Sequence, residues 1–143
     1  MEEKVKAYIA GIIDGEGCLS IVGNLKRLRP IVEISNCNKD LINWLLKNFK
    51  DFTVYNSKYI DSRNIKYKPQ FRIVLNTYDS IFRLLNEIKP YLVIKSKQAD
   101  IIIKFIESRF KRLEKDYHSH ISKEEIKFRN KIQKLNKKGG KTS

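Results

Sequence analysis

Two carboxylates stand at the end of the first predicted helix, with a glycine after each of them. Asp14 and Glu16 fall in the run Asp-Gly-Glu-Gly, directly after an amphipathic stretch. The last carbonyl groups of a helix lack donors within the helix, and the helix dipole places partial negative charge there. Carboxylate and carbonyl oxygens together are the ligands that Mg²⁺ prefers. The pattern therefore indicates a divalent-cation site, and the alternative is a pair of solvated acids in a turn.

Small residues share one face of the same predicted helix. Ala7, Gly11 and Gly15 are four residues apart, so they lie above one another on the helix surface. A glycine inside a helix costs about 1 kcal/mol relative to alanine, so two of them need a reason. A ridge of small residues lets a second helix approach closely. Two interpretations stay open: the ridge packs on the domain's own sheet, or it joins two copies of the chain.

The chain is strongly basic. Its 143 residues include 30 Lys or Arg and 16 Asp or Glu, which gives a net charge of +14. Charge of this size favours a polyanionic partner, and nucleic acid is the usual one. The alternative explanations are a generally basic proteome and a basic tail on an otherwise ordinary domain.

The rest of the composition is typical of one intracellular domain. The hydrophobic fraction of 41% is enough for a core, and no apolar run is long enough to span a membrane. The N-terminus lacks the apolar region of a secretory signal. Cys18 and Cys37 make no disulfide framework, which suits a reducing compartment. His118 and His120 are too few ligands for a zinc site.

Hydrophobic periodicity predicts an α+β domain with the element order α-β-β-α-β-β-α-α. We expect a twisted four-stranded antiparallel sheet backed by helices over residues 1–113, and a basic helical extension over 114–143 that frays from Lys137. Thr77 is the expected N-cap of the third helix. The expected helices begin near residues 3, 40, 77 and 96, and the expected strands cover residues 18–25, 30–37, 52–60 and 66–76.

The sequence of the first helix resembles a known motif. Residues 9–17 read IAGIIDGEG, which is similar to the LAGLIDADG motif of homing endonucleases and related RNA maturases. The resemblance extends over roughly residues 4–113, and a single motif copy is typical of the homodimeric branch. It implies that the helices of two chains pack through the ridge Ala7, Gly11 and Gly15. It also implies that Glu16 and the Gly15 carbonyl bind Mg²⁺, with Mn²⁺ as an expected substitute, while Asp14 is structural.

The resemblance further implies hydrolysis of one phosphodiester bond in each DNA strand, leaving short 3′ overhangs. Lys95, in the segment YLVIKSKQ over residues 91–98, matches a lysine near the scissile phosphate, and Lys97 is the second choice. Asn38 matches a position that orients waters around the metals. From the residues alone, Lys95 could instead bind phosphate or be solvated, and Asn38 could be the N-cap of the next helix.

The sheet of this family lies along the major groove of double-stranded DNA. A strand of about eight residues spans roughly eight base pairs, so two subunits would cover a long, near-palindromic site. Period-two alternation predicts outward base readers at Ser20, Val22, Glu33, Ser35, Tyr55, Ser57, Gln70 and Arg72. Basic residues near the two hairpin turns are expected to contact phosphates or guanine, namely Lys26, Arg27, Arg29, Arg63, Lys66 and Lys68.

The sequence therefore predicts an intron- or intein-associated homing endonuclease that acts on double-stranded DNA. Two other functions stay open. One is an RNA maturase or a non-cleaving binding module of the same family, with intron RNA as the partner. The other is a basic assembly protein that dimerises through the ridge of Ala7, Gly11 and Gly15.

Overall fold

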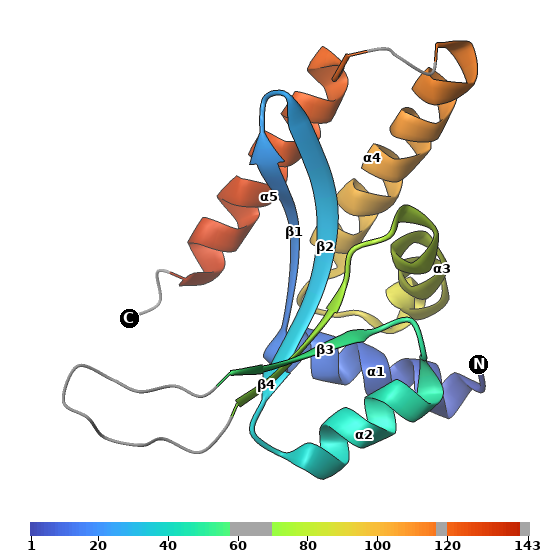
Figure 1. Cartoon of the computed structure of the whole chain (residues 1–143), viewed down its shortest axis with the longest axis vertical. Coiled ribbons are helices and arrows are strands. Elements are labelled where there is room, and N and C mark those ends of the chain that lie inside the picture. Colours follow the sequence, from blue (N-terminus) through green and yellow to red (C-terminus); the bar gives the residue numbers. More distant parts are fainter. Residues whose placement is uncertain (58–69, 117–119, 141–143) are drawn as a thin grey trace, which may run out of the picture.

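The computed structural model describes residues 1–57, 70–116 and 120–140 of the chain. The predicted order of elements is confirmed, with a short 3₁₀ turn in addition, and a fifth helix lies in the segment for which a helical extension was predicted (Figure 1). The elements are α1 (Glu3–Glu16), β1 (Gly17–Asn24), β2 (Arg27–Asn36), α2 (Lys39–Asn48), β3 (Thr53–Ser57), β4 (Gln70–Leu75), α3 (Tyr78–Ile88), η1 (Lys89–Tyr91), α4 (Ser96–Lys115) and α5 (Lys123–Gly140).

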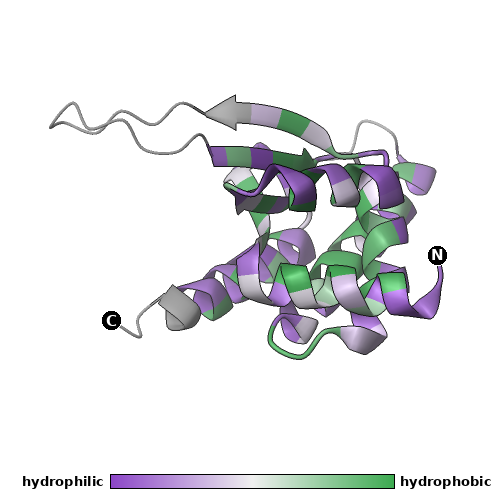
Figure 2. Ribbon diagram, turned by 90° about the horizontal axis from the view of Figure 1, so that it is seen from below, coloured by the Kyte–Doolittle hydropathy of each residue, from purple (hydrophilic) through white to green (hydrophobic). Residues whose placement is uncertain are grey.

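The four strands form one antiparallel sheet, as predicted, and the strand order in this sheet is β1-β2-β4-β3. The helices gather on one side of this sheet (Figure 2). Within the described residues, no helix combines the length and hydrophobicity needed to cross a membrane. Residues 58–69 lie outside the described part of the chain, so the predictions for Arg63, Lys66 and Lys68 concern residues that the structure does not describe.

The hairpin between β1 and β2 is tighter than predicted. A basic turn over residues 26–29 was expected, but Asn24 pairs directly with Arg27, and only two residues connect the strands. Asn24 Oδ1 accepts hydrogen bonds from the amides of Lys26 and Arg27, which stabilises the turn. Gly23 has a φ of +113°, and a Cβ there would lie 1.9 Å from the Arg27 carbonyl oxygen. Arg27 and Arg29 are therefore strand residues, and both are exposed.

Side chains alternate between the two faces of the sheet as predicted. The inner face is buried against the helices and carries Leu19, Ile21, Leu28, Val32, Ile34, Ile73 and Leu75. The opposite face, called the outer face below, carries the predicted readers Ser20, Val22, Glu33, Ser35, Tyr55, Gln70 and Arg72, all partly or fully exposed. Ser57 pairs with Gln70 at the end of β3.

The helix starts follow from local capping and from burial. Asn38 caps α2 through hydrogen bonds from the amides of Asp40 and Leu41 to its Oδ1. Thr77 occupies the N-cap position of α3, but its side chain makes no capping hydrogen bond, so that part of the prediction was wrong. The start of α3 is instead held by packing, because Ile81 and Leu84 are fully buried in the core.

The C-terminal segment is a helix from Lys123 to Gly140, and the predicted fraying from Lys137 stays a prediction. The expected boundary at residue 113 stays a prediction. Ser122 caps α5 by accepting a hydrogen bond from the amide of Glu125. Further along α5, Ile132 is fully buried, and the side-chain amide of Asn136 donates to the Leu19 carbonyl of β1. Contacts along its length therefore anchor α5 to the sheet.

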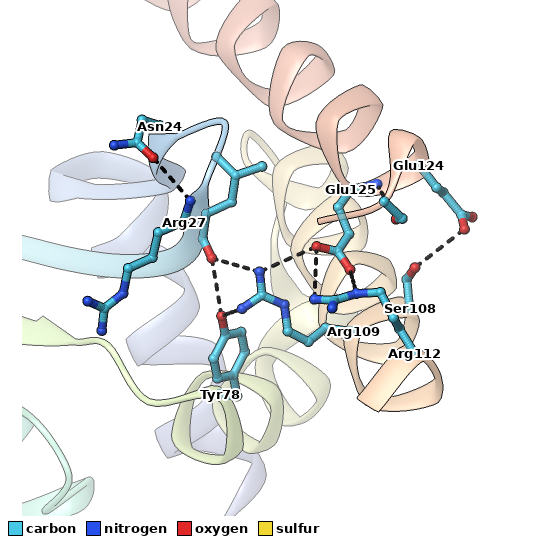
Figure 3. A network of polar contacts seen from close by, with 10 residues as sticks. Asn24, Arg27, Tyr78, Ser108, Arg109, Arg112, Glu124 and Glu125 are labelled. Atoms are coloured by element: carbon cyan, nitrogen blue, oxygen red, sulfur yellow. Dashed lines mark hydrogen bonds and ion pairs between the residues drawn. The ribbon is translucent and has the colours of Figure 1, made fainter. Parts of the chain in front are cut away.

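A buried ion-pair cluster joins α5 to α4 (Figure 3). The carboxylate of Glu125 is fully buried, and it accepts hydrogen bonds from Arg112 Nε at 2.6 Å and from Arg109 Nη2 at 3.3 Å. Arg109 Nη2 also donates to the Leu28 carbonyl of β2, and Nη1 donates to the Tyr78 hydroxyl. Burial raises the pKa of Tyr78, so its hydroxyl stays protonated. The cluster therefore links the base of α5 to α4, α3 and the first hairpin.

We expect Glu125→Gln to reduce the free energy of unfolding by about 3 kcal/mol, because two arginines would lose the charge that compensates their burial. Urea denaturation followed by circular dichroism measures this change. Glu124→Gln is the matched control, since Glu124 is exposed and makes a single 3.3 Å hydrogen bond with Ser108. Its expected effect is below about 0.5 kcal/mol. Equal effects of the two substitutions would contradict this role for Glu125.

Candidate active site

The candidate site begins at the abrupt junction between α1 and β1. Gly17 is the C-cap of α1, and its amide donates to the Ile13 carbonyl. A Cβ on Gly17 would lie 2.8 Å from the Ile13 carbonyl oxygen and 2.9 Å from its Cα, so a side chain would force the backbone apart. The chain can therefore pass from helix to strand without a loop. This places Glu16 at the very end of the helix, next to the first residue of the sheet.

The Glu16 carboxylate is exposed, and within the described residues it makes no hydrogen bond or ion pair. The carbonyls of Gly15 and Glu16 have no donor from within the helix because β1 follows directly. Exposed carboxylate and carbonyl oxygens are hard ligands that fit Mg²⁺. Among the described residues, no three His, Cys, Asp or Glu side chains of one chain come together as a metal site. The metal site at Glu16 therefore remains a prediction.

Asp14 has a different environment from Glu16. Its Oδ2 accepts a hydrogen bond from the amide of Val93 at 2.8 Å, and its Oδ1 accepts from the amides of Ile94 and Lys95 at 3.1 and 2.9 Å. These amides immediately precede α4, where the helix dipole favours a negative charge. Asp14 thus binds the C-terminal end of α1 to the N-terminal end of α4, and its carboxylate oxygens are occupied by backbone donors.

Lys95 lies next to the same helix end. Its ammonium group donates to the Asp14 carbonyl at 2.7 Å, and its side chain is half-buried. The interaction places a positive charge on the carbonyl of Asp14, which directly precedes Gly15 and Glu16 in the chain. Lys97 is exposed in the first turn of α4. The structure therefore brings Lys95 and Glu16 to one end of α1.

Asn38 lies at a groove between α1 and α2. Its Oδ1 is used as the N-cap of α2, which agrees with the alternative interpretation of this residue. The groove has a volume of about 660 Å³, and its lining includes Lys4, Tyr8 and Trp44. The rings of Tyr8 and Trp44 meet edge-on with centroids 4.7 Å apart. No contact in the described part of the chain joins Asn38 to Glu16 or Lys95, so its role near the metal stays a prediction.

The ridge of small residues does not pack on the chain's own sheet. Ala7, Gly11 and Gly15 are exposed, and a Cβ added to either glycine would meet no atom within 4 Å. The interpretation that the ridge packs internally was therefore wrong. Two apolar residues near this end of α1 are exposed, which no local sequence pattern indicated. Val93 and Ile94, held beside Asp14 by their amides, are 84% and 69% exposed.

Solved structures of homing endonucleases are similar to this chain. No protein-family model matches the sequence, and no curated protein matches it significantly. The archaeal intron-encoded homing endonuclease I-Vdi141I, complexed with DNA, is similar with a TM-score of 0.70 at 18% identity, over 94% of this chain and 86% of that chain. The homing endonuclease I-CvuI, in complex with its target in the presence of 2 mM Ca, is similar with a TM-score of 0.65 at 16% identity, over 92% of this chain and 82% of that one.

A longer protein shows the same similarity over part of its length. The LAGLIDADG homing endonuclease I-GzeII, in complex with its DNA target, matches 91% of this chain but only 43% of its own, with a TM-score of 0.59 at 16% identity. The resemblance inferred from residues 9–17 is thus confirmed at the level of the fold. The chain has the fold of the LAGLIDADG homing endonucleases.

Proposed function

We propose that this protein is a LAGLIDADG homing endonuclease that cleaves both strands of a specific DNA site as a homodimer. The observation that carries the proposal is the contrast between two acids at the end of α1. Among the described residues, the Glu16 carboxylate makes no hydrogen bond or ion pair, whereas the Asp14 carboxylate accepts hydrogen bonds from the amides of residues 93–95. A binding protein would have no need for an unpaired carboxylate at a helix end that disfavours negative charge. The arrangement is suited to a metal-dependent hydrolase.

The exposed ridge of α1 supports the homodimer. In the proposed assembly, α1 of each chain packs against its partner along Ala7, Gly11 and Gly15, whose small size permits close backbone contact. The C-terminal ends of the two helices then meet, and two Glu16 carboxylates approach one another. The outer faces of the two sheets extend to either side along the major groove and cover a long, near-palindromic site.

Each residue of the site has a distinct task in the proposed reaction. Bound Mg²⁺, held by Glu16 and the Gly15 carbonyl, would supply an activated water and charge stabilisation at the leaving oxygen. Lys95 keeps its ammonium group beside the helix end, where it can donate to a phosphate oxygen or to a water. Asp14 holds Lys95 and α4 in place. The proposed products carry short 3′ overhangs, and Mn²⁺ is expected to replace Mg²⁺.

We expect Glu16→Gln to abolish cleavage while binding of the same duplex survives, because the metal ligand is lost and the outer face of the sheet is unchanged. The assay uses a randomised duplex library with Mg²⁺, followed by sequencing of the cut ends, and a gel-shift measurement at low salt. Wild-type protein that binds DNA or intron RNA without cutting under any divalent cation would contradict the endonuclease and favour the maturase or binding module.

Asp14→Asn should act on stability, in contrast to Glu16→Gln. The substitution removes the charge that accepts three amide hydrogen bonds, and we expect a loss of about 2 kcal/mol in the free energy of unfolding. Glu16→Gln should leave stability unchanged or slightly higher, because it removes a negative charge from a helix C-terminus. Thermal and urea denaturation compare the two variants. Equal stability of both would contradict the separation of roles between the two acids.

Gly11→Leu tests the homodimer. A Cβ added at Gly11 meets no atom of the described residues within 4 Å, and leucine favours the helix by up to about 1 kcal/mol, so the protomer should stay folded. We expect a monomer in light scattering coupled to size exclusion, together with loss of cleavage. Asn43→Leu, on the exposed side of α2, is the control and should behave as wild type. A Gly11→Leu protein that keeps the dimer mass would contradict assembly through the ridge.

A further inference from the structure

A charged pair occupies the centre of the outer face. Arg72 of β4 donates from Nε to Glu33 Oε1 at 2.6 Å and from Nη2 to Oε2 at 3.3 Å. The two residues are diagonal neighbours, because Arg72 pairs with Ser35 on β2, two positions after Glu33. Both remain accessible, with 43% of the Arg72 side chain and 30% of the Glu33 side chain exposed. The pair is therefore made on the surface that the proposed function directs toward DNA.

The geometry of this pair leaves half of the guanidinium group available. A guanidinium has two edges that can donate parallel hydrogen bonds, and Glu33 uses the edge formed by Nε and Nη2. The edge formed by Nη1 and Nη2 still has one free N–H on each nitrogen, since no described residue accepts from Nη1. Two parallel N–H groups match the O6 and N7 acceptors of guanine in the major groove. Arg72 can thus contact Glu33 and a guanine at once.

A second contact restrains the plane of the same guanidinium group. Tyr55 of β3 lies directly across from Arg72, and the Arg72 Cζ is 5.5 Å from the centre of its ring. The hydrogen bonds and charge of Glu33 also raise the pKa of Arg72, so the group stays charged. An arginine that is already held in one orientation loses less conformational entropy on binding.

The presence of Glu33 is hard to explain by stability or by affinity. Exposed salt bridges contribute little to stability. A carboxylate on the outer face also weakens the attraction between a chain of net charge +14 and the DNA phosphates. Orientation of Arg72 is the remaining benefit. Each oxygen of Glu33 already accepts one hydrogen bond from Arg72, so the carboxylate has less accepting capacity left for a base of its own.

We propose that Arg72 reads one guanine in each half of the DNA target, and that Glu33 is a positioning residue that holds Arg72 for this contact. The inference rests on the proposed function, since it requires the outer face to lie in the major groove. At one position in each half-site, the recognised group would be the O6 and N7 edge of guanine. Glu33 would then orient Arg72 and would not read a base itself, in contrast to the prediction from alternation.

The test is selection of bound duplexes from a randomised library in metal-free buffer, for wild type, Arg72→Lys, Glu33→Gln and the double variant. We expect wild type to select guanine at one symmetric pair of positions. Arg72→Lys should lose that preference by roughly 5- to 150-fold, because lysine lacks the parallel donors. Glu33→Gln should weaken the preference at the same positions. In the Arg72→Lys background it should have no further effect.

Arg83→Lys is the matched control, because Arg83 of α3 also pairs with a carboxylate, that of Asp51, and also lies over an aromatic ring, that of Phe49, but it belongs to a helix and not to the outer face. It should leave the guanine preference intact. A change at a different position in Glu33→Gln would show that Glu33 reads its own base, and an unchanged site in Arg72→Lys would show that Arg72 reads none. Either result overturns this inference and leaves the endonuclease proposal standing. Wild-type protein that selects no duplex at low salt overturns both.

Discussion

The hydrogen bonds between the Asp14 carboxylate and the amides of residues 93–95 are the constraint on which the candidate site depends. A carboxylate at the C-terminal end of a helix is unfavourable, and here the N-terminal end of α4 compensates for it. Because the two helix ends are joined, Lys95 lies against the Asp14 carbonyl. The same contact exposes Val93 and Ile94 beside the end of α1. Asp14 and Glu16, separated by a single glycine, thus have different environments. The Asp14 carboxylate accepts three amide hydrogen bonds, and the Glu16 carboxylate is exposed.

Local patterns were sufficient for the architecture but not for this contact. Alternation of Leu19 and Ile21 with their polar neighbours sets the faces of β1, and the helical spacing of Ile9 and Ile13 sets the buried side of α1. Both patterns lie within a few residues. Asp14 and Lys95 are 81 positions apart, so spacing alone could not show that they meet. The motif resemblance placed both residues near the site, and the resemblance left their contact unspecified.

The same limit applies to the C-terminal segment. Its apolar stripe is weak, so the local pattern did not show what holds this helix on the domain. The helix is stabilised by partners elsewhere in the chain, since Glu125 meets Arg109 and Arg112 of α4, and Asn136 meets a carbonyl of β1. A capping motif, Ser-x-x-Glu over residues 122–125, was the one local signal for the start of α5. The register of the first hairpin likewise depended on Gly23 and Asn24 rather than on the basic residues that follow.

The partners of the acidic residues bear on how the proposed dimer would bind metal and DNA. Three acids have partners within the chain: Glu125 and Glu33 pair with arginines, and Asp14 accepts hydrogen bonds from backbone amides. Glu16 has no such partner among the described residues. In the proposed dimer, two Glu16 carboxylates and the negative ends of two helix dipoles would meet at the symmetry axis and repel one another. A divalent cation bound there would remove that repulsion, and the nearby Lys95 and Lys97 would attract the phosphates of DNA. The association of the α1 helices, the binding of metal and the binding of DNA should therefore reinforce one another, because each supplies charge that the others lack.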